Sequence, residues 1–89
     1  MNPQPKEKRI VNKSHLDRVK KMQCLICLKL GVDAHHLDSV GSGGSDFSVV
    51  PLCRDHHREF HTMGIILFEE KYKINIWRDC WQILHETLI

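Results

Sequence analysis

Residues 50–61 read VPLCRDHHREFH, and this stretch decides the fold. An apolar run ends here and a polar stretch with one cysteine and three histidines follows. The apolar run predicts a strand over residues 47–52. The polar stretch predicts a helix over residues 54–63, because Gly64 stands where a glycine commonly ends a helix. We therefore expect a strand that leads directly into a histidine-bearing helix.

The histidines of this helix are expected to point in two directions. His57 and His61 are four residues apart, so both project from one helix face. His56 and His61 are five apart, and at 3.6 residues per turn their directions diverge by about 140°. The spacing of His57 and His61 fits two ligands of one metal ion. The alternative is that His61 is an ordinary surface histidine at the helix end.

A second group of metal ligands begins upstream. Cys24 and Cys27 are separated by two residues, which lets both thiolates reach one ion, and Cys53 and His56 repeat that spacing. Together the four residues predict a closed structural zinc site of the Cys3His type. Chance spacing or a redox pair would also explain Cys24 and Cys27 alone, but the second half-site favours zinc.

Two adjacent histidines supply further ligands. His35 and His36 fall in a predicted strand over residues 32–37, where neighbouring side chains point to opposite faces. The one that faces the helix would join His57 and His61 at a second ion. The other would need a twist, or the end of the strand, to reach the same cleft. The alternative is one ligand and one surface histidine.

The remaining N-terminal half predicts one short helix and two polar segments. We expect a disordered basic arm over residues 1–12 and a flexible Gly-rich loop over residues 39–45. Ser14 is expected to cap a helix whose apolar face carries Leu16 and Val19. The folded part is then a single domain over 13–89.

The C-terminal part predicts two further helices. One covers residues 65–72 and the other follows Asn75, a favourable N-cap residue. Four apolar side chains of the last helix are spaced for one helical face, which we expect to pack into the core: Trp77, Trp81, Leu84 and Leu88.

Length and charge limit the class of protein. A chain of 89 residues has room for one domain with a marginal core, for which a metal ion is a common support. No apolar run could span a membrane and no secretory signal is present, so we expect a cytoplasmic protein with reduced cysteines. Residues 1–21 carry a net charge of +5 and the remainder −3, which suits a polyanionic partner.

The combined pattern resembles a known enzyme family. It runs from a Cys-x2-Cys knuckle through His-His and a Gly-rich loop to PLCRDHHREFH at 51–61. This pattern is similar to that of the HNH endonucleases, which have a ββα-metal (His-Me finger) core. Together with KSHLDRV at 13–19 and FEEKY at 68–72, it looks closest to the small phage nucleases of the Ref type, which depend on the RecA recombinase. The resemblance covers about residues 13–75.

The resemblance implies a fold and roles for individual residues. The implied fold is small α+β, with a ββα-metal core, a zinc knuckle, an N-terminal helix and C-terminal helices. His36 matches the general base that activates water, and the remaining matches are metal ligands: His35, His57 and His61 for a catalytic divalent ion, and Cys24, Cys27, Cys53 and His56 for structural zinc.

Other positions extend or depart from the family pattern. The central Asn of the HNH name, which braces the loop between the strands, falls where Ser48 stands, and Asp46 could share its task. Arg54 and Arg58 could clamp phosphates, although they could equally be solvated ions or partners of nearby acidic residues.

The resemblance also implies a function, a metal and partners. The expected activity is hydrolysis of phosphodiester bonds in DNA, by nicking or with low sequence specificity, with Mg²⁺, Mn²⁺, Ni²⁺ or Zn²⁺ at the catalytic site. Expected partners are DNA and a recombinase or another phage or host DNA-processing protein, with the chain a monomer or weak dimer in a bacterial host. The alternative function is a non-catalytic zinc-binding module that contacts DNA or protein.

Overall fold

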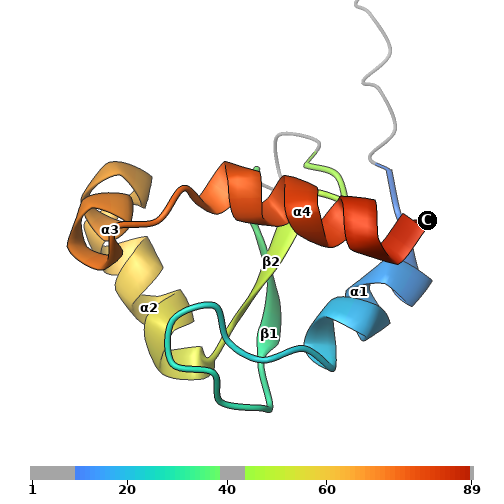
Figure 1. Ribbon diagram of the computed structural model, residues 1–89, viewed down its shortest axis with the longest axis horizontal. Coiled ribbons are helices and arrows are strands. Elements are labelled where there is room, and N and C mark those ends of the chain that lie inside the picture. Colours follow the sequence, from blue (N-terminus) through green and yellow to red (C-terminus); the bar gives the residue numbers. More distant parts are fainter. Residues whose placement is uncertain (1–9, 39–43, 89) are drawn as a thin grey trace, which may run out of the picture.

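The computed structural model describes residues 10–38 and 44–88. Within these residues the fold is small α+β, as predicted, with four helices and a two-stranded sheet. Figure 1 shows the two strands near the centre, with α4 lying across them and α2 and α3 together at one end. The elements in chain order are α1 (Lys13–Lys20), β1 (Asp33–His36), β2 (Val49–Leu52), α2 (Arg54–Met63), α3 (Ile65–Tyr72) and α4 (Ile76–Leu88).

The sheet is antiparallel and buried. His35 pairs with Val50 and His36 with Val49, and all four residues of β2 are buried. Helices α1, α2 and α4 all contact β2, which explains why its apolar run does not alternate with polar residues. Because side chains alternate along a strand, Asp33 and His35 share one face of β1 and His36 lies on the other. The rings of His35 and Phe60 are 4.4 Å apart, so the face with His35 is the one toward α2.

Most predicted helix boundaries are confirmed. Helices α2 and α3 have the predicted bounds, and Gly64 between them has a φ of 83°, a conformation that favours glycine. Asn75 caps α4, because its side-chain oxygen accepts a hydrogen bond of 3.0 Å from the Arg78 N–H. The strands are shorter than expected.

The N-cap of α1 was predicted at the wrong residue. Asn12, not Ser14, caps the helix, and its side-chain oxygen accepts a 2.9 Å hydrogen bond from the His15 N–H. The structure therefore includes the last residues of the expected disordered arm. Residues 1–9 of that arm and residues 39–43 of the expected flexible loop lie outside the described residues.

The prediction that Trp77 and Trp81 belong to the core is wrong. They are 43% and 62% exposed, and the ring of Trp81 stacks on His85 instead. The buried side chains of α4 are Ile76, Cys80 and Ile83, which lie along the side of the helix that contacts β2. The apolar surface of α4 is wider than the sheet can cover, and spacing alone does not say which part is covered. The side chain of Leu88 lies outside the described residues.

The core is small. Apart from Phe68, Leu52, Ile76 and Ile83, its buried hydrophobic members are valines and cysteines. A core of this size provides little free energy of unfolding, so a bound metal ion would add a large share. None of the described helices is long and apolar enough to cross a membrane.

Candidate metal centres

A tight turn places the first two cysteines beside the end of β2. The Cys24 N–H donates to the Lys29 carbonyl at 2.9 Å, and the Leu25 N–H donates to the Pro51 carbonyl at 3.1 Å. Leu28 has a φ of 63°, which reverses the chain after Cys27. The turn is thus fastened to the strand that leads into Cys53.

Four ligand atoms meet at this point, and we call these four residues, Cys24, Cys27, Cys53 and His56, the sulfur cluster. Their ligand atoms all lie within 4.8 Å of one another. The Cys27 and Cys53 sulfurs are 3.7 Å apart, and His56 Nδ1 is 3.7 Å from the Cys24 sulfur and 3.1 Å from that of Cys53. Ligands of a tetrahedral zinc ion lie roughly 3.4–3.8 Å apart. The sulfur cluster could therefore bind a metal ion such as zinc.

The electrostatics of the sulfur cluster also favour a cation. Burial raises the pKa of the Cys24 thiol, but the backbone N–H groups of Cys27, Cys53 and Ile26 outweigh it and lower that pKa to about 6. The pKa of Cys53 is raised, by burial and by the neighbouring thiols. One thiolate forms easily, but three buried thiolates together need a positive charge between them. None of the four cysteines forms a disulfide.

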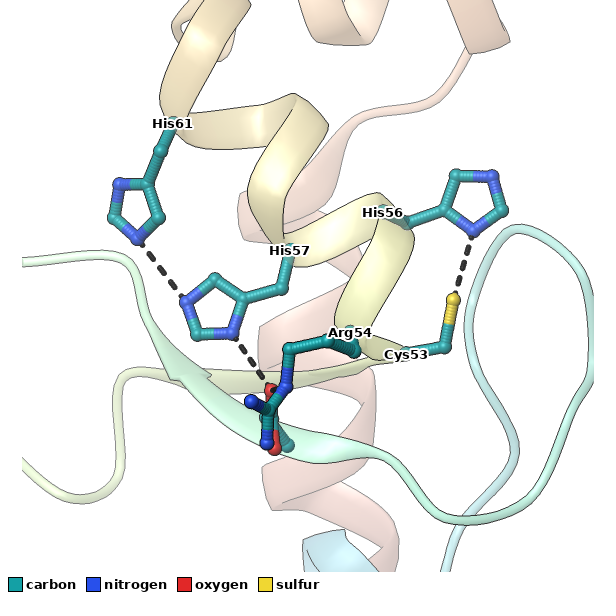
Figure 2. A network of polar contacts seen from close by, with 6 residues as sticks. Cys53, Arg54, His56, His57 and His61 are labelled. Carbon is teal, nitrogen blue, oxygen red and sulfur yellow. Dashed lines mark hydrogen bonds and ion pairs between the residues drawn. The ribbon is translucent and has the colours of Figure 1, made fainter.

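A second set of ligand atoms lies on another side of α2, and we call these residues, His35, His57 and His61, the histidine cluster. Their ring nitrogens lie within 4.8 Å of one another, and the two Nε2 atoms of His57 and His61 are 3.0 Å apart. Figure 2 shows His57 and His61 on one side of the helix and His56 beside Cys53 on the other. The structure therefore divides the histidines of α2 as the helical spacing predicts, with His56 in one ligand group and His57 and His61 in the other.

His35 is the buried member of the histidine cluster. It is 2% exposed, and its Nε2 has no hydrogen-bond partner within the described residues. Burial, together with His57 and His61, lowers the pKa of His35 to about 4, so the ring is neutral near pH 7. A buried ring nitrogen without a hydrogen-bond partner among the described residues, close to two other imidazoles, fits a metal ligand.

Asp33 orients His57. Its carboxylate accepts from His57 Nδ1 at 3.0 Å, which leaves Nε2 of that ring for a metal ion. The His57 hydrogen bond, assisted by Arg54, lowers the pKa of Asp33 despite partial burial. Carboxylate–histidine pairs of this kind fix the ring and raise its basicity in metal sites.

Loss of the hydrogen bond between Asp33 and His57 is expected to change the metal affinity of the histidine cluster. We expect Asp33→Ala to weaken binding of a divalent ion at the histidine cluster about 10–100-fold, because His57 loses the group that fixes its ring. Titration of the zinc-loaded protein with Mn²⁺ measures this effect. The matched control is Asp55→Ala, an exposed acidic residue on α2, the helix that carries His57. Equal affinities in the two variants would contradict the orienting role.

The histidine cluster opens onto a depression at the surface. The depression has a volume of about 430 Å³ and is lined by Asp33, Arg54, His57, Arg58 and His61. The Arg54 side chain is 76% exposed and its Nε lies 3.3 Å from the Asp33 carboxylate. Both predicted phosphate-binding arginines thus lie at the rim of the histidine cluster, where an anion could reach them and a bound metal together.

His36 does not line this depression. Its Nε2 contacts the carboxylate of Asp46 at 2.9 Å, on the other face of β1. The loop near Ser48 is braced by main-chain groups: the Ser48 carbonyl accepts from the Leu37 N–H at 2.8 Å, and its N–H donates to Ser45 at 3.0 Å. Ser48 therefore holds the loop to the strand end through its backbone, beside the contact between Asp46 and His36.

Sequence reasoning missed several residues. Asp33 lies two positions before His35, and that spacing in a strand could have placed both on one face. Glu59 bonds Lys71 and Tyr72 of α3, so Tyr72 is held edge-on against the ring of His56. His15 is fully buried against Phe47, and burial lowers its pKa; nothing in the sequence distinguished it from a surface histidine.

Comparisons with known proteins give a family but no activity. A family model described as "Protein of unknown function (DUF968)" matches residues 2–85. The chain is also 41% identical over 73 residues to the uncharacterized protein YdfU of Escherichia coli K12, an alignment that covers 76% of this chain and 21% of that protein. The chain thus spans about a fifth of the length of this relative. No solved structure shows a significant match.

Proposed function

The chain belongs to the DUF968 family of proteins of unknown function, and we propose from its own residues that it is a metal-dependent endonuclease of the HNH type. The proposed core consists of β1, β2 and α2, with the sulfur cluster as a structural zinc site. The proposed reaction is hydrolysis of phosphodiester bonds in DNA. Its proposed catalytic residues are His36 and the histidine cluster.

One observation carries this proposal, the all-imidazole site beside two arginines. Three neutral ligands fill only part of the coordination sphere of a divalent ion, so phosphate and water could take the open positions. The site opens to solvent through a depression rimmed by Arg54 and Arg58. A purely structural metal site is closed, as the sulfur cluster would be, so the histidine cluster is better suited to bind a substrate.

The residues in and around the histidine cluster have different roles in the proposed reaction. When bound, a divalent ion supplies a Lewis acid that stabilises negative charge on the phosphate and on the leaving oxygen. Arg54 and Arg58 bind the phosphates of the DNA backbone. Asp33 keeps His57 in one orientation. Contacts to phosphates carry no sequence information, so cleavage is expected to have low sequence specificity.

His36 is the proposed general base. Its role rests on the resemblance to HNH enzymes, because it lies on the face of β1 opposite His35 and outside the depression. Its side chain is 22% exposed, so water can reach the ring. A neutral imidazole can accept a proton from water, which is the task of a general base. Since Nε2 faces Asp46, the nitrogen that would accept this proton is Nδ1.

The basic residues among the first 21 positions support a polyanionic substrate. Residues 1–21 carry a net charge of +5, and α1 ends in Arg18 and Lys20, which are exposed. An excess of positive charge attracts nucleic acid without regard to its sequence. The proposed protein partner is a recombinase or another DNA-processing protein. Only the resemblance to Ref-type phage nucleases supports this partner.

A plasmid-nicking assay tests the function. We expect the zinc-loaded chain to convert supercoiled plasmid to open circles when Mn²⁺, Mg²⁺, Ni²⁺ or Zn²⁺ is added, and to stop when a chelator removes that ion. Loss of the metal at the histidine cluster, in His57→Ala, should abolish nicking. A wild type that is inert with every ion, although it retains its zinc, would favour a non-catalytic zinc-binding module.

A further inference from the structure

A buried polar contact outside the two clusters joins β1 to the loop before β2. His36 Nε2 and Asp46 Oδ1 are 2.9 Å apart, and the Asp46 side chain is only 1% exposed. Hydrogen bonds between charged and polar groups strengthen when water is excluded. Neither residue belongs to the sulfur cluster or the histidine cluster, so this contact needs its own explanation.

The main chain holds Asp46 in place from the N-terminal side. The Asn12 N–H donates to Asp46 Oδ2 at 2.8 Å, and the Asp46 N–H donates to the Ile10 carbonyl at 2.9 Å. Asn12 is also the cap of α1. The carboxylate is therefore fixed by the segment that begins the first helix, and the ring of His36 contacts a group whose position is already set.

This arrangement selects one protonation pattern for the His36 ring. An ionised carboxylate only accepts hydrogen bonds, so the ring nitrogen facing it must carry a hydrogen. In a neutral ring this leaves the lone pair on Nδ1. The contact thus fixes both the orientation of the ring and the nitrogen that can take a proton.

We propose that Asp46 is a positioning residue that holds His36 as the Nε2–H tautomer, with Nδ1 ready to accept a proton from water. The catalytic role of Asp46 rests on the proposed endonuclease function, whereas the tautomer of His36 does not. The contact also gives the segment before α1 a role in the site, because Asn12 bonds the carboxylate that orients the ring and Ile10 bonds the main chain of Asp46.

The tautomer can be measured without any activity. In long-range proton–nitrogen NMR spectra of the zinc-loaded protein above pH 7.5, we expect His36 as the Nε2–H tautomer with a slowly exchanging ring proton. Asp46→Ala should make that proton exchange at least tenfold faster. If this variant does not fold, the isosteric Asp46→Asn should show the same direction, since its neutral acceptor is weaker. Asp17→Asn, at an exposed site on α1, is the matched control.

Nicking kinetics then test whether Asp46 contributes to catalysis through His36. Loss of the carboxylate that orients a catalytic histidine lowers kcat by up to about 10⁴. We expect Asp46→Asn to lower kcat about 10²–10⁴-fold, with KM within about twofold and zinc content unchanged. A variant that nicks with the wild-type kcat, or a wild-type His36 in the Nδ1–H form, would overturn the proposal. A wild type with the expected spectrum but no nicking would refute the endonuclease function, and the catalytic role of Asp46 with it.

Discussion

Replacement of Cys53 by serine is expected to unfold the domain. The buried core is small, and the apparent free energy of zinc binding at structural sites is about 10–16 kcal/mol near pH 7, which is at least as large as the stability of many domains, about 5–15 kcal/mol. Cys53 connects β2 to α2 and contributes to the sulfur cluster. Circular dichroism and zinc analysis of Cys53→Ser should therefore show lost helix and lost zinc together.

The fourth cysteine provides the control for this experiment. Cys80 is also buried, but it lies in α4 and belongs to neither cluster. Cys80→Ala removes a sulfur of similar burial, and we expect it to keep one tightly bound zinc ion and the native circular dichroism spectrum. A folded Cys53→Ser protein with a full complement of zinc would show that the sulfur cluster is not the structural site.

Replacement of His36 by alanine is expected to lower the nicking rate about 10²–10⁴-fold, the usual contribution of a general base. The variant should keep its zinc, its fold and its affinity for a divalent ion, because His36 is a member of neither cluster and its side chain bonds Asp46. Single-turnover nicking with saturating metal separates the chemical step from metal binding and is the suitable measurement.

His85→Ala is the matched control for His36→Ala. His85 is an exposed histidine of α4 whose ring stacks on Trp81, away from both clusters. Its removal should leave the nicking rate unchanged. If His36→Ala nicks as fast as this control, then His36 has a structural role and another group activates water.

The sequence predicted the parts of the fold that local rules determine. The bounds of α2 and α3 followed from the position of Gly64, and the division of ligands between the two clusters followed from the helical directions of His56 and His57. These relations involve residues a few positions apart, where backbone geometry fixes how side chains are placed.

Tertiary contacts set the features that the sequence did not predict. Trp77 and Trp81 have the spacing of a core face, but the contact with β2 selects the side of α4 with Ile76 and Cys80. The contact between His36 and Asp46 was not predicted either, because it joins residues ten positions apart and no local spacing rule places them together. Spacing shows which residues share a face, whereas the packing of other elements decides which face is buried.

Metal content measured together with ligand type tests the central claim of two separate metal sites on α2 most directly. We expect X-ray absorption and elemental analysis of the wild type with added Ni²⁺ to find one zinc bound mainly by sulfur and one nickel bound only by nitrogen and oxygen. His57→Ala should keep the zinc and lose the nickel. A single ion per chain, or nickel bound by sulfur while the histidine cluster stays empty, would contradict the account.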